Sequence, residues 1–276
     1  MMSTATLAAP AKFGIYDRVR WAVIDSLTMS RRNFIVWYRV PAFVMFTLVQ
    51  PVMFTLLFRY VFGGAIPVQV KGGYVNYLLP GVIGQTAAFG SFGTAIALAR
   101  EMQKGTLDRF KSMPMARSAV LAGRLIADTA RMLVTIVVMI AVGYAVGFRF
   151  ENGIGPAIGM VVLALAFGLV VCCVSAYIGL AIKDEESVQA FGLIWVFPLT
   201  FVSSAFVPIQ SMPGWLQAFA NNQPVTIVIN TMRHLALGPS PSAQTLEPHL
   251  WQSIVWLIGI LAVFGPLAVR TYRRNS

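Results

Sequence analysis

The chain has 276 residues, of which 57% are hydrophobic and 11% are charged, and its mean hydropathy is +0.72. Soluble domains carry about 25% charged residues, so this composition excludes an ordinary soluble protein. It indicates an all-α integral membrane protein with a single membrane domain. The formal net charge is +11. Because the basic residues flank apolar runs instead of forming one patch, we expect membrane sidedness and no nucleic-acid partner.

Residues 1–33 are expected to form a cytoplasmic tail followed by an amphipathic helix. From Lys12 to Arg32, apolar side chains recur at helical spacing, and charged side chains occupy the rest of the helix surface. Trp21 suits the lipid headgroup region. The pattern predicts an interfacial helix on the inner leaflet, and we expect this helix also to contact a partner protein. The apolar positions are Tyr16, Val19, Val23 and Leu27.

Residues 34–269 are expected to contain six membrane-spanning helices. A helix needs about 20 apolar residues to cross the hydrocarbon core, and the chain has uncharged runs for six such helices. The run at 132–148 is short, so the third helix is predicted to begin earlier, near Ala119. The predicted spans are approximately 40–58, 74–99, 119–148, 156–182, 188–207 and 248–269, and a basic cytoplasmic tail follows at 270–276.

Two short helices are predicted between the fifth and sixth spans, within the outer segment 210–247. Pro213 and Pro224 each suit the first turn of a helix, and Gly238-Pro239 would end the second helix. Helices of this length are too short to cross lipid.

The loop between the second and third spans sets the orientation of the chain. Residues 100–131 hold seven of the 21 basic residues. A charge at the centre of a membrane helix costs roughly 2.5–3.5 kcal/mol, and an excess of Lys and Arg marks cytoplasmic loops. With this loop inside, 17 basic residues lie on the inner side and four on the outer side. We therefore expect a multi-pass protein of the plasma membrane with both termini in the cytoplasm.

Within this loop, residues 100–117 contain a candidate docking helix. Thr106 suits an N-cap and Pro114 suits the end of a short helix. Two interpretations remain open: the helix docks on another protein, or the segment is a solvated hairpin that rests on the headgroups. The apolar face of the helix would consist of three residues at a spacing of three, Leu107, Phe110 and Met113.

Charged residues at the inner ends of two further spans also have alternative interpretations. Arg124, Asp128 and Arg131 share one face of the third helix, because they stand at positions i, i+4 and i+7. They form either a salt-bridged helix end or a gate that transmits movement of the docking helix. The acidic run 184–186 forms either a contact for a basic partner surface or a solvated loop.

The sequence lacks the residue patterns of covalent, metal or nucleotide chemistry. It contains no phosphate-binding loop of the form G-x-x-x-x-G-K-[ST]. Cys172 and Cys173 are adjacent packing residues, and His234 and His249 have no further metal ligands beside them in the sequence. We therefore expect a non-catalytic protein without a bound cofactor, powered from outside the chain. An ion-coupled carrier is the less favoured alternative, because the ionisable residues lie toward the ends of the spans.

Two segments resemble the type-2 ABC exporter permeases, above all the daunorubicin/doxorubicin-resistance branch. They are RFKSMPMARSAVLAGRLIADTAR (109–131) and NQPVTIVINTMRHLALG (222–238), and the six-span layout agrees with the family. In that family, the loop matched by 100–114 includes a coupling helix that docks on the ATP-binding subunit. Relatives often carry Arg at the position of Lys111. Lysine keeps the positive charge but cannot form the two parallel hydrogen bonds of a guanidinium.

The resemblance implies a permease subunit that exports a hydrophobic or amphiphilic compound, with ATP and Mg²⁺ bound by a separate subunit. It implies a second permease, either a copy or a paralogue, and two short outer helices that dip into the outer leaflet. Export of a cell-envelope lipid or a lipid-linked glycan is the alternative within the same class. The coupling residues it implies are Glu101, Lys104, Gly105, Thr106, Leu107, Arg109, Phe110, Lys111 and Met113.

Polar and aromatic residues within the first two spans are candidates for a substrate pathway. Adaptable aromatic contacts and a few amides suit a bulky apolar cargo. The alternative is that such aromatic residues pack against neighbouring helices or face lipid. The candidates are Gln50, Asn76, Gln85 and Phe89.

Overall fold

The computed structural model describes residues 15–39, 41–66, 68, 70, 72–105, 117–239 and 246–275, and every regular element in these ranges is helical. The all-α prediction is therefore confirmed for this part of the chain. The elements are α1 (Ile15–Arg39), α2 (Pro41–Leu57), η1 (Phe58–Phe62, a π-helix), α3 (Tyr74–Gln103), α5 (Arg117–Ala145), α6 (Ile154–Ile182), α7 (Glu185–Phe201), η2 (Ile209–Ser211), α8 (Gly214–Asn222), α9 (Pro224–Leu237) and α10 (Leu246–Asn275).

Four helices are long and apolar enough to cross a membrane. They are α3, residues 120–145 of α5, α6, and residues 249–274 of α10. Two further predicted spans correspond to α2 and α7, which have 17 residues each. At a rise of about 1.5 Å per residue, helices of this length reach only the lower limit for a span. The six-span count stays a prediction.

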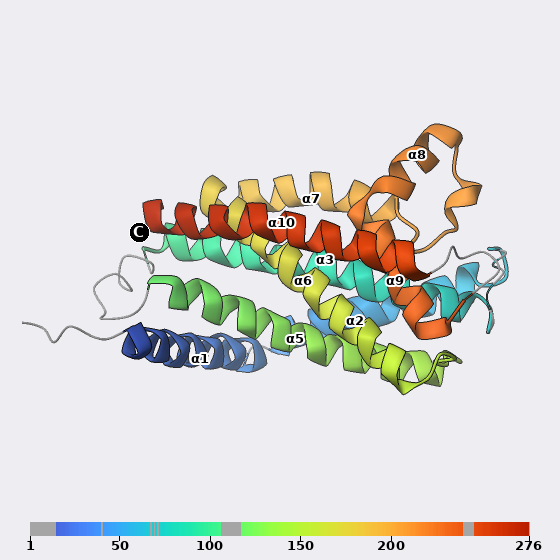
Figure 1. Ribbon diagram of the computed structural model, residues 1–276, viewed down its shortest axis with the longest axis horizontal. Helices are drawn as coiled ribbons and strands as arrows, with labels where there is room; N and C mark the ends of the chain where they lie inside the picture. The colour runs from blue at the N-terminus through green and yellow to red at the C-terminus, as the bar shows by residue number, and fades with distance from the viewer. Residues whose placement is uncertain are drawn as a thin grey trace, which may run out of the picture.

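The long helices form an elongated bundle (Figure 1). At one end, on the left of Figure 1, α1 begins, α3 ends, α5 begins and α10 ends. At the other end, α8 and α9 lie beside the start of α10. We call these the α1 end and the α9 end.

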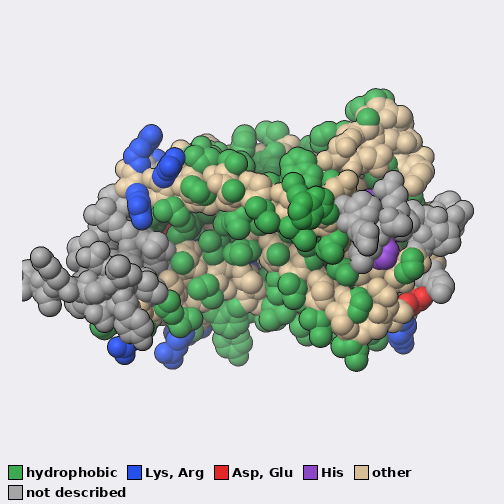
Figure 2. All heavy atoms as spheres, viewed as in Figure 1, with side chains coloured by type: hydrophobic (Ala, Val, Ile, Leu, Met, Phe, Trp, Pro, Cys, Tyr) green, Lys and Arg blue, Asp and Glu red, His purple; other side chains and the backbone are tan. Residues whose placement is uncertain are grey.

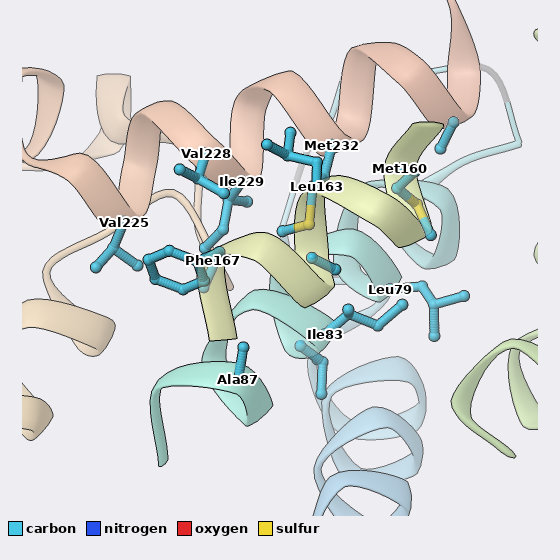
Figure 3. Close-up of a cluster of buried hydrophobic side chains, with 14 of the residues drawn as sticks. Leu79, Ile83, Ala87, Met160, Leu163, Phe167, Val225, Val228, Ile229 and Met232 are labelled. Atoms are coloured by element: carbon cyan, nitrogen blue, oxygen red, sulfur yellow. The ribbon is translucent and has the colours of Figure 1, made fainter. Parts of the chain in front are cut away.

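The core of the bundle lies between α3, α6 and α9 (Figure 3). Glycine allows close packing at several places around this core. A Cβ on Gly84 would lie 2.6 Å from Ile229, and one on Gly81 or Gly179 would collide with backbone atoms of the facing segment. Small residues allow membrane helices to approach closely in this way. Gly90, in contrast, faces open space.

The surface between the two ends is largely apolar. Figure 2 shows Lys and Arg side chains toward the ends of the molecule and hydrophobic side chains over the length between them. On α7, Ile194 is 72% exposed, and on α10, Trp251 is 67% exposed. A soluble monomer rarely exposes apolar residues over so wide an area. Such a surface suits contact with lipid or with another membrane subunit.

Helix boundaries agree with the sequence in the outer segment and differ at the two ends of the chain. α9 begins at Pro224 and ends against Gly238, as predicted. The N-terminal helix extends to Arg39 instead of ending near Arg32. The predicted basic tail at 270–276 is helical as far as Asn275, because α10 continues without a break beyond the predicted span; its cytoplasmic position stays a prediction. Its basic residues therefore project from a helix, where positive charge also favours the C-terminal dipole.

α1 packs on the bundle with a different face from the one that the sequence emphasises. Ser26, Met29 and Ser30 are buried, whereas Val23 and Leu27 are exposed. α1 runs alongside the first half of α5 (Figure 1). A Cβ on Gly123 of α5 would lie 2.6 Å from the Cβ of Met29, so glycine permits this contact. Val23 and Leu27 of the predicted apolar stripe are thus on the surface, while the side chains of Tyr16 and Val19 lie outside the described residues. The interfacial position of the helix stays a prediction.

Candidate coupling and gating site

A cluster of ionic side chains joins three helices near the α1 end. The carboxylate of Glu101, on α3, lies 3.7 Å from the guanidinium of Arg32 on α1 and 3.6 Å from that of Arg124 on α5. The side chain of Glu101 is 18% exposed and that of Arg124 is 14% exposed. One carboxylate thus holds two cations from different helices. The three helices are thereby connected next to segment 106–116.

Asp128 is the buried centre of the same cluster. Its side chain is 7% exposed, and its carboxylate lies 3.5 Å from Arg124 and 3.0 Å from Arg131. Thr94 of α3 donates a hydrogen bond to Asp128 Oδ2 at 2.6 Å. Arg131 also donates to the carbonyl of Gly90 at 3.1 Å. Each charge thus has an opposite charge or a hydrogen-bond partner, which offsets part of the cost of burying it.

The spacing of these residues explains why they meet. Arg124, Asp128 and Arg131 follow one another along one face of α5, as the sequence indicates. The structure contains both ion pairs expected on this face. Their contacts with Thr94 and Glu101 could not be inferred, because nothing in the sequence gives the rotation of α3 relative to α5.

A second polar link joins the end of α3 to the start of α7. Arg100 forms a salt bridge with Glu185, and Gln103 donates to the Asp184 carboxylate at 2.8 Å. Asp184 also caps α7 by accepting from the backbone N–H of Ser187 at 2.8 Å. Asp184 and Glu185 thus have partners within the chain, but they remain partly exposed to solvent, as the solvated-loop interpretation expects. A contact with a partner surface stays a prediction. Asp184 followed by two acidic residues and an apolar run was an N-cap signal that the sequence analysis missed.

Most of the predicted coupling residues lie outside the described residues. These are Thr106, Leu107, Arg109, Phe110, Lys111 and Met113. Glu101, Lys104 and Gly105 are described, and only Glu101 belongs to the ionic cluster. Lys104 is exposed and ends α3. Gly105 has φ of +61°, a conformation that glycine adopts without strain and that turns the chain away from the helix.

The four predicted pathway residues do not form one site. Gln50 is exposed on α2. Asn76 is fully buried, donates to Glu151 at 3.4 Å, and accepts from the backbone N–H of Arg149. Phe89 packs edge-on against Phe197, and Gln85 is buried on α3. Asn76 and Phe89 thus have packing partners within the chain, and a role in transport stays a prediction for all four.

The α9 end holds a second polar site that the sequence analysis did not single out. The Arg233 guanidinium lies 3.7 Å above the ring of Tyr77. It donates to the Tyr77 carbonyl at 3.1 Å, the Ser204 carbonyl at 2.9 Å and Asn230 Oδ1 at 2.8 Å. Arg233 borders a cavity of about 1210 Å³ between the segment after η1, the turn after α7, η2, α8, α9 and α10. In the sequence, Arg233 counted only as one of four outer basic residues.

Comparison with known proteins connects this architecture to a transporter family. Residues 26–237 match the family described as ABC-2 type transporter. The chain is 30% identical over 258 residues to the daunorubicin resistance ABC transporter permease protein DrrB1 of Streptomyces coeruleorubidus, covering 92% of this chain and 88% of the relative. It is also 30% identical over 270 residues to the probable doxorubicin resistance ABC transporter permease protein DrrC of Mycobacterium tuberculosis, covering 97% and 95%. A putative transport permease, ycf38, of Pyropia yezoensis is 26% identical over 205 residues, covering 72% and 69%.

Proposed function

The chain belongs to the ABC-2 type transporter family, and on this premise we propose that it is the permease of an exporter driven by a separate ATP-binding subunit. Two of its relatives are named as permeases of daunorubicin or doxorubicin resistance transporters. We infer that the cargo is likewise a hydrophobic or amphiphilic compound. Hydrolysis then takes place on the partner subunit, which binds ATP and Mg²⁺, and this chain has no catalytic role.

The proposed topology has six spans, with α2 together with η1 and α7 as the two shorter ones. Both termini lie in the cytoplasm, because this orientation places 17 basic residues inside and four outside. The α1 end is then cytoplasmic, and α8 and α9 lie in or near the outer leaflet. We place the protein in the plasma membrane, with α1 along the inner leaflet.

The position of the ionic cluster is the observation that carries this proposal. Glu101 and Arg124 come from the two helices that flank segment 106–116, and Arg32 joins them from α1. A push on that segment would therefore act on α1, α3 and α5 together. We assign docking of the ATP-binding subunit to the apolar side of that segment. Arg124, Asp128 and Arg131 are the gate that transmits the movement to the spans.

The assembly we propose contains two permeases and two ATP-binding subunits. The exposed apolar faces of α7 and α10 leave ample surface for a second permease and for lipid. Closure of the ATP-binding subunits would move both coupling segments, and the spans would release the cargo outward.

The test is a double substitution, Leu107→Asp with Phe110→Asp, in the complete transporter in proteoliposomes. We expect ATP hydrolysis to continue while ATP-dependent export is lost, because two charges replace the apolar docking face. Trp215→Asp with Phe219→Asp is the matched control, since both residues are exposed on α8 at the opposite end. If the Leu107→Asp, Phe110→Asp variant exported at the same rate as the control, the assignment of docking to this segment would be refuted. Export that runs on a proton gradient without ATP would instead identify an ion-coupled carrier.

A further inference from the structure

The cavity at the α9 end combines an apolar wall with a few convergent polar groups. The apolar wall includes Val207, Ile227, Leu237 and Trp256. The polar groups include Asn230, Arg233 and two histidines. A histidine side chain is visible at the surface of this end in Figure 2. At about 1210 Å³, the cavity is somewhat larger than the usual small-molecule site of about 300–1,000 Å³. It has room for the head and part of the chain of an amphiphile.

Arg233 brings a positive charge to this cavity, and no carboxylate among the residues that the structure describes pairs with it. Its three hydrogen-bond partners, described above, are two backbone carbonyls and the Asn230 amide, all neutral. Among the described residues that line the cavity, none is acidic. A guanidinium has five N–H donors, and these three bonds leave one on each terminal nitrogen. Two donors on one planar group match the oxygens of a phosphate or carboxylate.

Two imidazoles add buried polar atoms that lack partners among the described residues. The Nδ1 atoms of His234 and His249 are both buried without a hydrogen bond, and both residues line the cavity. His234 is only 7% exposed. These Nδ1 atoms have no surface open to the cavity, so a ligand cannot reach them in this structure. The hydrogen-bond donors of Arg233 therefore determine which head group the cavity accepts.

We propose that this cavity binds the anionic head group, phosphate or carboxylate, of an amphiphile whose apolar chain lies against the Ile227 and Trp256 side of the cavity. The guanidinium of Arg233 would hold the head group through its two remaining donors. Binding of the amphiphile does not depend on the proposed function. Only the statement that this amphiphile is the exported cargo, bound on the exit side, rests on the proposed function. A lipophilic cation is excluded from the same position by the charge of Arg233.

The experiment measures lipid binding to the full-length chain purified in neutral detergent. Native mass spectrometry would follow retention of phosphatidylglycerol and of phosphatidylcholine across a titration. The decisive variant is Asn230→Asp. Asn230 Oδ1 accepts from both Arg233 and Ser204, so a carboxylate keeps both hydrogen bonds while it neutralises the guanidinium. Folding is thereby preserved, whereas Arg233→Gln also removes bonds that hold α9 to α3.

We expect the wild-type chain to prefer phosphatidylglycerol, and Asn230→Asp to lower that preference about tenfold, or about 1.4 kcal/mol. Arg149→Gln is the matched control, because Arg149 is an exposed arginine at the same end and outside the cavity lining; it should keep the preference. A preference that survives Asn230→Asp, or that is lost equally in Arg149→Gln, would overturn the site. If millimolar inorganic phosphate displaced the lipid, the cavity would be a phosphate site, and the proposal of an amphiphile as its ligand would be refuted. Displacement by tetraphenylphosphonium would overturn the anionic assignment.

These results remain separate from those of the coupling test. The lipid titration requires neither ATP nor the partner subunit, so it can succeed if the coupling assignment fails. Conversely, export that is blocked by Leu107→Asp with Phe110→Asp says nothing about the head group. If the site binds the cargo, Asn230→Asp should also slow export of an anionic amphiphile while ATP hydrolysis persists.

Discussion

Substitution of Asp128 by asparagine tests the energetic role of the ionic cluster. The asparagine side chain keeps the shape of aspartate and can still accept from Thr94, whose hydrogen bond to Asp128 is 2.6 Å long. What disappears is the negative charge beside Arg124 and Arg131, whose side chains are 14% and 19% exposed. Removing one partner of a fully buried ion pair costs about 3–5 kcal/mol. Because the two arginines retain some exposure, we expect a loss of about 2–3 kcal/mol in the free energy of unfolding.

Reversible unfolding by sodium dodecyl sulfate in mixed micelles would measure this loss. Glu185→Gln is the control, because it breaks the more exposed pair with Arg100, whose side chain is 46% exposed. Surface pairs contribute about 0–1 kcal/mol. The double variant Asp128→Asn with Arg131→Gln should recover part of the loss, since one unbalanced cation is removed with the carboxylate. The reasoning is refuted if Asp128→Asn destabilises the protein no more than Glu185→Gln does.

Two further predictions concern helix packing and one cap. Gly179→Val should reduce the yield of folded protein and lower its stability by about 3 kcal/mol or more, because the new side chain collides with the backbone at Ala95. Gly90→Ala is the control. Its new methyl group faces open space, so it should be neutral in the same unfolding titration. The pKa of Asp184 is lowered, because Ser187 and then Gln103 donate hydrogen bonds to its carboxylate. Its charge therefore stabilises the fold above the unfolded pKa of about 3.9 and ceases to do so as the pH falls through the lower folded pKa. Asp184→Asn should thus be less stable than wild type at pH 7 and equal to it near pH 2, and a constant difference between the two pH values would contradict the charge effect.

The sequence predicts helices well where local chemistry decides. Pro224 at the start of α9 and Gly238 at its end are turn signals whose effects do not depend on the rest of the chain. The long uncharged runs likewise place α3, α5 and α6 within a few residues, because each run must match the thickness of a membrane. At the end of α10, the change from apolar to basic residues predicts where the span ends but not where the helix ends. A basic segment can continue as helix beyond the apolar run.

Contacts between distant segments were beyond the reach of the sequence. Arg233 and Tyr77 are separated by 156 positions, and their contact depends on the turn after α7 as well as on α9. Asn76 looked like a pathway residue because it is polar within an apolar run. In the fold it instead ties α3 to the loop before α6, through Glu151 and Arg149. A polar residue in a span indicates a specific partner, but the sequence does not say whether that partner is a ligand or the protein.

Helix α3 connects the two sites. Its 30 residues run without interruption from Tyr74 to Gln103, a length of about 45 Å. Near its end, Thr94 and Glu101 enter the ionic cluster, and near its start, Tyr77 supports Arg233. Because α3 is one continuous helix, a tilt at the α1 end would shift the Tyr77 carbonyl near its other end. Such a shift would alter one of the three bonds that position the guanidinium. A mechanical input could thus change head-group affinity at the far end without any catalytic residue in between.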